Sequence, residues 1–166
     1  VNSYLARAEK GELKEADARK MAIDAISGAR FDNGNYYFII DFDGISVSHA
    51  NKKIETTDMK PLKDAAGKFF VQDMVKLAKT SGSGFIDYGW TKPGDKDPSL
   101  KISYVVAIPK WQWTVGSGLH VQDVDKAFMS MIADVAKVLV PLGLAMLGLV
   151  VVLSRRASAM PRPKPD

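Results

Sequence analysis

The amino-acid sequence predicts an α+β fold. We expect an antiparallel sheet of five to six strands with a long N-terminal helix on one face, followed by a C-terminal transmembrane helix. Three observations support this fold: a helical repeat of apolar residues in 3–29, five short runs rich in β-branched and aromatic residues between turn formers, and an uncharged stretch at 138–153. The predicted order of helix, two strands, helix, three strands and helix indicates an antiparallel sheet.

Residues 3–29 are predicted to be helical because their apolar positions recur about every 3.6 residues. These positions are Leu5, Leu13, Met21, Ala22, Ala25 and Ile26. Gly11 could divide the helix into two pieces. Residues 36–42 (YYFIIDF) then predict a buried strand, and residues 45–49 predict its partner across an Asp43-Gly44 turn.

A second helix is predicted over residues 68–79, with Phe69, Phe70, Met74 and Leu77 on its apolar side. Strands at 85–90 and 100–108 then form a second hairpin, because the loop between them is rich in proline, glycine and aspartate. Leu100, Ile102, Tyr104, Val106 and Ile108 alternate with other residues in the later strand. A fifth strand is predicted at 111–119, and a helix follows from about residue 121.

Residues 138–153 (VLVPLGLAMLGLVVVL) carry no charge and predict a membrane span. Sixteen helical residues rise only about 24 Å, against a hydrocarbon core of roughly 30 Å, so we place the span at about 132–153. Basic residues follow it in the Pro-rich tail, namely Arg155, Arg156, Arg162 and Lys164. Because positively charged segments stay in the cytoplasm, the domain before the span is predicted to be periplasmic, in a bacterial inner membrane.

The predicted domains are an extracytoplasmic domain at 1–125, a helix at 126–154 that continues into the span, and a short basic cytoplasmic tail at 155–166. The net charge of +4 comes mostly from the end of the chain. Five basic and two acidic side chains fall in residues 131–166, and the remaining 18 basic and 17 acidic side chains balance each other. A nucleic-acid partner is therefore not predicted.

The sequence offers no catalytic, metal or cofactor motif. The chain has no cysteine, and its two histidines, His49 and His120, have no metal-ligand spacing. Asp41-Phe42-Asp43-Gly44 is similar to a calcium loop but lacks the downstream glutamate. Ser117 between two glycines lacks the flanks of a nucleophile elbow. We expect no enzyme activity, no cofactor and no metal.

Several segments, in this order and at this spacing, resemble the single Cache domain, the PAS-like extracytoplasmic sensor module of bacterial chemoreceptors and sensor kinases. The resemblance covers roughly residues 10–125. It departs from the family at Ala50, where proline is usual, and in the loop at 52–58. The matching residues are Tyr36-Tyr37-Phe38-Ile39-Ile40-Asp41, Gly44, His49, Asp64, Gly67-Lys68, Gly82, Gly84, Tyr88-Gly89-Trp90, Lys92-Pro93-Gly94, Lys101-Ile102-Ser103-Tyr104, Trp111-Gln112-Trp113 and Gly116-Ser117-Gly118.

The resemblance implies a PAS-like fold and a pocket for a small organic anion of the acetate, propionate or pyruvate class, on the sheet face away from the N-terminal helix. Lys101 would supply charge, His49 a donor, and the tyrosines hydroxyl groups. Two registers stay open, with Tyr88 opposite either Ser103 or Tyr104, and only the first places Lys101 beside the aromatic residues. The candidate ligand-binding residues are Lys101, Tyr104, Tyr88, Trp90, His49, Tyr37 and Phe38.

Two functions remain open from sequence. The first is a membrane-anchored sensor of chemoreceptor type, in which a short carboxylate biases the C-terminal helix. The second is a single-span accessory subunit of a larger membrane complex, which would use the Cache-like domain for docking. Gly143, Ala145 and Gly148 in the span would permit close approach of partner helices, and a homodimer is also compatible with the sequence.

Overall fold

A computed structural model of the chain describes residues 1–32 and 34–158. Helices and strands follow one another in the predicted order, with one additional short strand near residue 30 and two 3₁₀ turns. In chain order the elements are α1 (Asn2–Glu9), α2 (Glu15–Ser27), β1 (Arg30–Phe31), β2 (Asn35–Asp41), β3 (Ser46–Ser48), η1 (Lys52–Ile54), α3 (Phe70–Ser81), β4 (Ser83–Trp90), β5 (Ser99–Ile108), η2 (Pro109–Trp111), β6 (Trp113–His120) and α4 (Val121–Ser158).

The six strands form an antiparallel sheet in the order β1-β2-β6-β5-β4, with β3 paired to β2. This confirms the predicted α+β, PAS-like class. The central strand β6 pairs with β2 on one side and with β5 on the other, so it joins the two hairpins that the sequence predicts. In the second hairpin Tyr88 lies opposite Lys101. This register is shifted by two residues from the alternative that pairs Tyr88 with Ser103. A shift of two leaves each side chain on the same face of the sheet, so Lys101 still shares a face with Tyr88.

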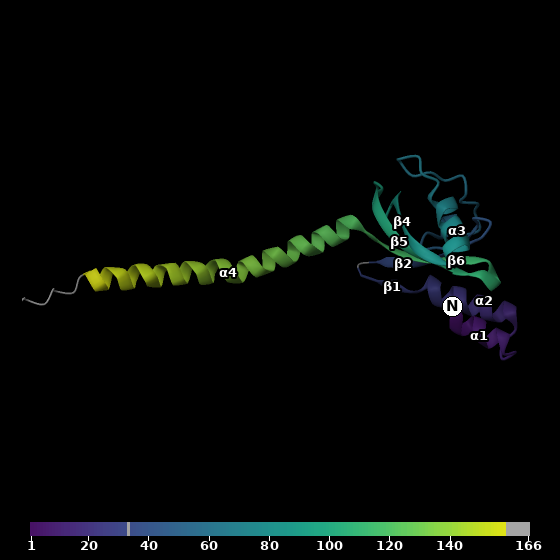
Figure 1. The fold of residues 1–166 in the computed structure, drawn as a ribbon, viewed down its shortest axis with the longest axis horizontal. Helices are drawn as coiled ribbons and strands as arrows, with labels where there is room; N and C mark the ends of the chain where they lie inside the picture. The colour runs from purple at the N-terminus through teal and green to yellow at the C-terminus, as the bar shows by residue number, and fades with distance from the viewer. Residues whose placement is uncertain (33, 159–166) are drawn as a thin grey trace, which may run out of the picture. The chain divides into compact units, whose positions relative to one another are not determined.

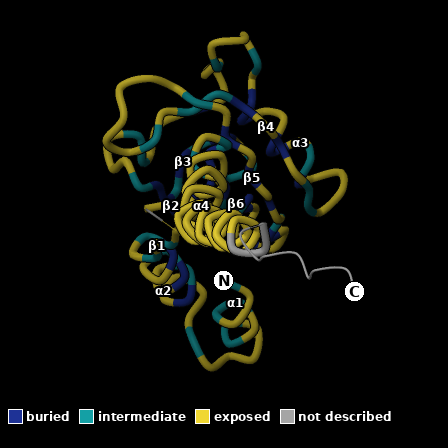
Figure 2. The backbone as a smooth tube through the Cα atoms, turned by 90° about the vertical axis from the view of Figure 1, so that its left-hand side faces the viewer, coloured by how far each residue is buried: buried dark blue, intermediate teal, exposed yellow. Residues whose placement is uncertain are grey.

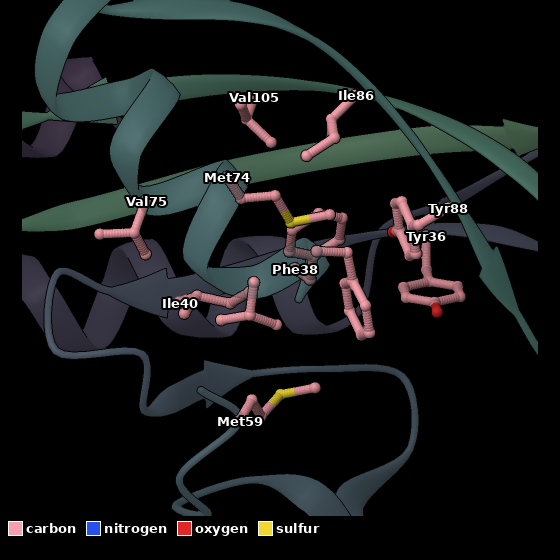
Figure 3. Packing of buried hydrophobic residues seen from close by; sticks show 11 residues of the cluster. Tyr36, Phe38, Ile40, Met59, Met74, Val75, Ile86, Tyr88 and Val105 are labelled. Atoms are coloured by element: carbon pink, nitrogen blue, oxygen red, sulfur yellow. The ribbon is translucent and has the colours of Figure 1, made fainter. Parts of the chain in front are cut away.

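Helices α2 and α3 lie on opposite sides of the sheet (Figure 1). On the α2 side, buried Ala18, Ala22 and Ile26 pack against Ile39 and the tryptophans Trp111 and Trp113. The α3 cluster occupies the other side, and Figure 3 shows its side chains packed together. Its members are Tyr36, Phe38, Ile40, Met59, Phe70, Val71, Met74, Val75, Ile86, Tyr88 and Val105. Strand β2 contributes to both layers because its side chains alternate between faces.

The N-terminal helix is divided as Gly11 indicates. Helix α1 ends at Glu9, α2 begins at Glu15, and Gly11 between them has a φ of +73°. The second predicted helix begins and ends two residues later than expected. Phe69 precedes it and is 38% exposed, so this phenylalanine does not join the apolar side of α3 as predicted.

Strand β5 buries the residues between its large apolar positions. Leu100, Ile102 and Tyr104 are 49%, 43% and 43% exposed, whereas Lys101 and Ser103 are 1% and 0% exposed. The apolar alternation therefore identifies the strand correctly but marks its exposed positions, except for Ile108, which is 4% exposed and belongs to the core on the α2 side. The buried face carries polar groups because it belongs to the candidate site described below.

Helix α4 begins within the domain and continues beyond it. The chain divides into a compact unit, Val1–Asp123, and a second unit from Val124 onward. In the part of the chain that the structure describes, Val121–Arg155 is the one helix long and apolar enough to cross a membrane by length and composition. Its residues 124–155 are all exposed (Figure 2), and Pro141 lies inside it. The predicted tail beyond residue 158 lies outside the described residues.

A methyl group at Gly116 should destabilise the domain. Gly116 pairs with Phe38 across β6 and β2, and a Cβ there would overlap the Phe38 ring. We expect Gly116→Ala to lower the free energy of unfolding by about 1–3 kcal/mol, the usual effect of overpacking. The measurement is chemical unfolding of the full chain in detergent, monitored by circular dichroism.

Gly28→Ala is the matched control for this substitution. Gly28 has a φ of −88°, and the nearest atom to a Cβ there is the Asp24 carbonyl oxygen at 3.9 Å. The control should leave stability unchanged or raise it slightly. Equal stability of the Gly116→Ala and Gly28→Ala variants would contradict the packing described at β6.

Candidate ligand-binding site

Lys101 is a buried cation on the α3 face of the sheet. Strand β5 places it opposite Tyr88 on one neighbouring strand and His120 on the other. Its side chain is 1% exposed, and its Nζ lies 4.1 Å from the ring centroid of Tyr36 and 5.7 Å from that of Phe38. Among the described residues it forms no ion pair.

Burial lowers the pKa of Lys101 to about 8. The aromatic faces compensate only part of the lost hydration, since a cation–π contact is worth roughly 0.5–2 kcal/mol. A buried charge without a counter-ion is rare because its desolvation is costly. Lys101 is therefore the group in this domain that an anion would stabilise most.

Three strands place hydroxyl groups on the same face of the sheet as this lysine: Tyr36 in β2, Tyr88 in β4 and Ser103 in β5. The Tyr88 hydroxyl lies 3.0 Å from the Ser103 Oγ, and Trp90 Nε1 donates to the Tyr36 hydroxyl at 2.8 Å. Burial raises the pKa of Tyr36 to about 12 and raises the pKa of Tyr88 as well, so both hydroxyls stay protonated. Phe70 from α3 stacks on Tyr88 with ring centroids 4.7 Å apart. These contacts fix the orientation of the hydroxyl groups.

His49 follows β3 and is 7% exposed. Its Nδ1 accepts a hydrogen bond from the Asn51 backbone amide at 2.9 Å, which leaves the proton of the neutral ring on Nε2. Burial, with a further contribution from the charge of Lys101, lowers the pKa of His49 to about 4. The ring is therefore a neutral donor near neutral pH, packed edge-on against Tyr36 and Trp90.

Two spaces meet at His49 and Trp90, which line both. The outer cavity has a volume of about 500 Å³ and is bordered by Asn51, Ile54 and residues 91–95 of the β4–β5 loop. The inner void, between the sheet and α3, has a volume of only about 10 Å³. This volume has room for about one water molecule at most. Among the described residues that line these two spaces Lys101 does not appear, so a carboxylate can reach it only if the aromatic side chains around it move.

Five of the seven predicted residues lie on the α3 face: Lys101, Tyr88, Trp90, His49 and Phe38. The other two do not join them. Tyr37 is 39% exposed and packs on Phe31, and Tyr104 is 43% exposed and donates to the Ser83 Oγ. Both lie on the opposite face because side chains alternate along a strand, and Phe38 and Lys101 already point to the α3 side. We remove Tyr37 and Tyr104 from the candidate site.

The prediction missed Tyr36 and Ser103. Both lie two residues from a correctly placed candidate, Phe38 for Tyr36 and Lys101 for Ser103, and therefore share its face. A strict period of two applied to those strands would have selected them. The loop residues 91–95 carry no such signal, since only the tertiary fold brings that loop beside His49.

The loop that borders the outer cavity is attached at both ends to the junction of β6 and α4. Near its start, the Lys92 Nζ lies 2.6 Å from Asp123 Oδ2, and the two side chains are only 16% and 22% exposed. At its end, the Ser99 hydroxyl lies 2.7 Å from Nδ1 of buried His120. Asp123 lies in the first turn of α4. These two contacts connect the loop to the start of that helix.

Comparison with known proteins identifies relatives of this chain. Residues 1–139 match the family described as Cache domain. The chain is similar to Methyl-accepting chemotaxis protein McpP of Pseudomonas putida, with 34% identity over 153 residues, which cover 91% of this chain and 28% of that protein. The chain therefore spans less than a third of that curated relative.

Two solved structures share the fold. One, described as a periplasmic sensor domain of chemotaxis protein, is 37% identical with a TM-score of 0.70, and the match covers 72% of this chain and 84% of that one. The other comes from work on carboxylic acid recognition by a Cache chemosensory domain. It is 33% identical with a TM-score of 0.69, and the match covers 72% of this chain and 82% of that one.

Proposed function

Because this chain belongs to the Cache domain family and carries a sensor domain of the chemoreceptor kind, we propose that its pocket binds a short organic carboxylate of the acetate, propionate or pyruvate class. The single observation that carries the proposal is the burial of Lys101 without an ion-pair partner among the described residues. A cation that is buried, unpaired among the described residues and surrounded by aromatic rings favours an anionic ligand. A solved neighbour with 33% identity is a Cache domain studied for carboxylic acid recognition, which supports the same class.

The surrounding groups fit one carboxylate rather than two. Lys101 is the only lysine or arginine among the fully buried side chains of the described residues, while His49 is neutral near pH 7. Lys101 would pair with one oxygen, and the hydroxyl of Tyr88 or the Nε2–H of His49 would donate to the carboxylate. Phe38, Phe70 and Trp90 would enclose a short apolar tail.

Binding would require rearrangement of the pocket. The inner void is too small for a carboxylate, so His49 and Trp90 would move aside and then close over the ligand. Trp90 also precedes the loop at 91–95, which borders the outer cavity. A ligand would therefore select a different arrangement of the loop from that of the free domain.

The proposed placement is a bacterial inner membrane, with the Cache domain in the periplasm and the segment after α4 in the cytoplasm. The apolar length of α4 and the basic residues Arg155 and Arg156 support this orientation. The proposed domain limits are 1–125 for the sensor domain and about 132–153 for the span. The signal would pass from the loop through Lys92–Asp123 and Ser99–His120 to α4.

A thermal-shift screen of the full chain in detergent tests the ligand class. Acetate, propionate, pyruvate and lactate are titrated, and at least one should raise the melting temperature by roughly 5–10 °C when its concentration is a hundredfold above Kd. Acetamide and propionamide are the matched controls, since they retain the shape and lack the charge. Stabilisation by the amides alone, or by none of these compounds at millimolar concentration, would contradict the proposal and favour an accessory docking role.

A further inference from the structure

A second hollow lies between α3 and the turn that joins β2 to β3. It has a volume of about 360 Å³ and shares no lining residue with the cavity or the inner void around His49. Its lining combines three lysines with apolar and uncharged polar groups. The residues are Phe42, Gly44, Lys60, Gln72, Val75, Lys76, Lys79 and Thr80.

The charged side chains that line this hollow are all positive. No aspartate or glutamate is among the described residues that line it, and none of the ion pairs in the described chain includes Lys60, Lys76 or Lys79. Like charges gathered around one hollow repel one another. An anion bound between them would relieve that repulsion.

Two of the three lysines are held in place. The aliphatic stem of Lys60 lies directly over Gly44, which has a φ of +82° and leaves no room for a Cβ. The Lys60 carbonyl accepts a hydrogen bond from Gln72 Nε2 at 2.9 Å. The Lys79 Nζ donates to the Phe42 carbonyl at 3.1 Å and lies 5.0 Å from the centroid of the Phe42 ring. Side chains that are already ordered lose less entropy when they bind a ligand.

The floor of the hollow is apolar. Val75 is 8% exposed and belongs to the α3 cluster, and Phe42 packs against the same cluster. An inorganic ion would gain nothing from these side chains, whereas a ring or a branched carbon skeleton would remove them from water. A ligand that suits both the three lysines and the apolar floor has an apolar body and more than one negative charge.

We propose that this hollow, lined by Lys60, Lys76 and Lys79 over Phe42 and Val75, is a second ligand site for a small organic dianion with an apolar body, such as an aromatic dicarboxylate. The two ends of such a ligand would pair with different lysines while its ring covers Phe42 and Val75. This site does not depend on the carboxylate pocket at Lys101.

Isothermal titration calorimetry of the full chain in detergent tests this site, with isophthalate as the probe. The Lys101→Met chain is used as the background, so that binding in the buried pocket does not contribute. Benzoate, with one charge, should bind more weakly than isophthalate. We expect Lys76→Gln and Lys79→Gln each to raise the isophthalate Kd about tenfold, since a hydrogen bond to a charged group is typically lost in each.

Lys20→Gln on the exposed side of α2 is the matched control. It removes the same charge from a residue that is distant in sequence and does not line the hollow. The control should leave the Kd unchanged. Equal Kd values for the Lys20→Gln and Lys76→Gln variants, or undetectable isophthalate binding at millimolar concentration, would overturn the proposal. If the short carboxylates also fail to bind the wild-type chain, that result concerns the Lys101 pocket and leaves the isophthalate titration as an independent test.

Discussion

Replacing Lys101 by methionine is expected to make the free domain more stable and to abolish its stabilisation by short carboxylates. The shift of the Lys101 pKa from 10.5 to about 8 corresponds to a cost of about 3 kcal/mol for holding the charged form in the fold. Methionine has a similar length and no charge, so it removes this cost and keeps the packing between Tyr36 and Phe38. Substitution of a buried charge by an apolar side chain often stabilises a protein.

The pH dependence follows from the same shift. Because the folded pKa lies below the unfolded one, the unfolded chain binds more protons between about pH 8 and 10.5. The penalty is therefore fully present below about pH 8 and is relieved as the pH rises through that window. Carboxylate affinity should follow the protonated lysine, constant below about pH 8 and falling about tenfold for each pH unit above it.

Thermal unfolding of the full chain in detergent at pH 7, with and without propionate, checks both parts of this prediction. Lys110→Met is the control, since the Lys110 side chain is 60% exposed and pairs with Glu9 at the surface. The control should retain the ligand response and gain little stability. A Lys101→Met variant that is still stabilised by propionate as strongly as the wild type would show that this lysine does not bind the ligand.

The sequence predicted the elements and the sheet face of the site because these depend on local periodicity. The alternation of Tyr36, Phe38 and Ile40 with Tyr37 and Ile39 already determines which residues share a face. Tyr37 nevertheless lies on the opposite face from Phe38, whereas Tyr36 shares the face of Phe38. The strand period carries more information here than the residue type, since neighbouring residues of a strand point to opposite faces.

The register and the loop contacts could not be predicted from local patterns. Tyr88 lies opposite Lys101 rather than opposite Ser103 or Tyr104, and no local pattern in either strand distinguishes these registers. The exposure of the apolar residues of β5 was equally unexpected. A strand that must present Lys101 and Ser103 to a buried site exposes the side chains between them, and composition alone would have oriented it the other way.

The contact between Lys92 and Asp123 should be necessary for transmission of the ligand signal but not for ligand binding. Its two side chains lie in the loop bordering the outer cavity and in the first turn of α4, respectively. They are 2.6 Å apart and largely shielded from solvent, so water screens the pair less than it screens the exposed pairs of this chain. Asp123→Asn removes the charge on the helix side and leaves the residues that line the cavity intact.

Electron paramagnetic resonance on the full chain in lipid nanodiscs measures this transmission. The chain has no cysteine, so Lys126→Cys provides a single spin-label position about one turn after Asp123. Propionate should change the mobility of this label, because loop closure pulls on Asp123 and tilts or restrains the start of α4. In the Asp123→Asn chain most of that change should disappear, while the propionate Kd measured by calorimetry stays within about threefold, a difference of less than 1 kcal/mol.

Glu9→Gln is the matched control, because it also converts an acid to an amide and breaks an ion pair, in this case the exposed contact of Lys110 Nζ with Glu9 Oε1 at 2.9 Å. The label should respond to propionate in this control as it does in the wild type. An Asp123→Asn chain that binds propionate and changes the label mobility as fully as the control would show that α4 is reached by another route. The Ser99–His120 contact would then be the remaining link between the loop and the helix, because it joins the other end of the same loop to the residue immediately before α4.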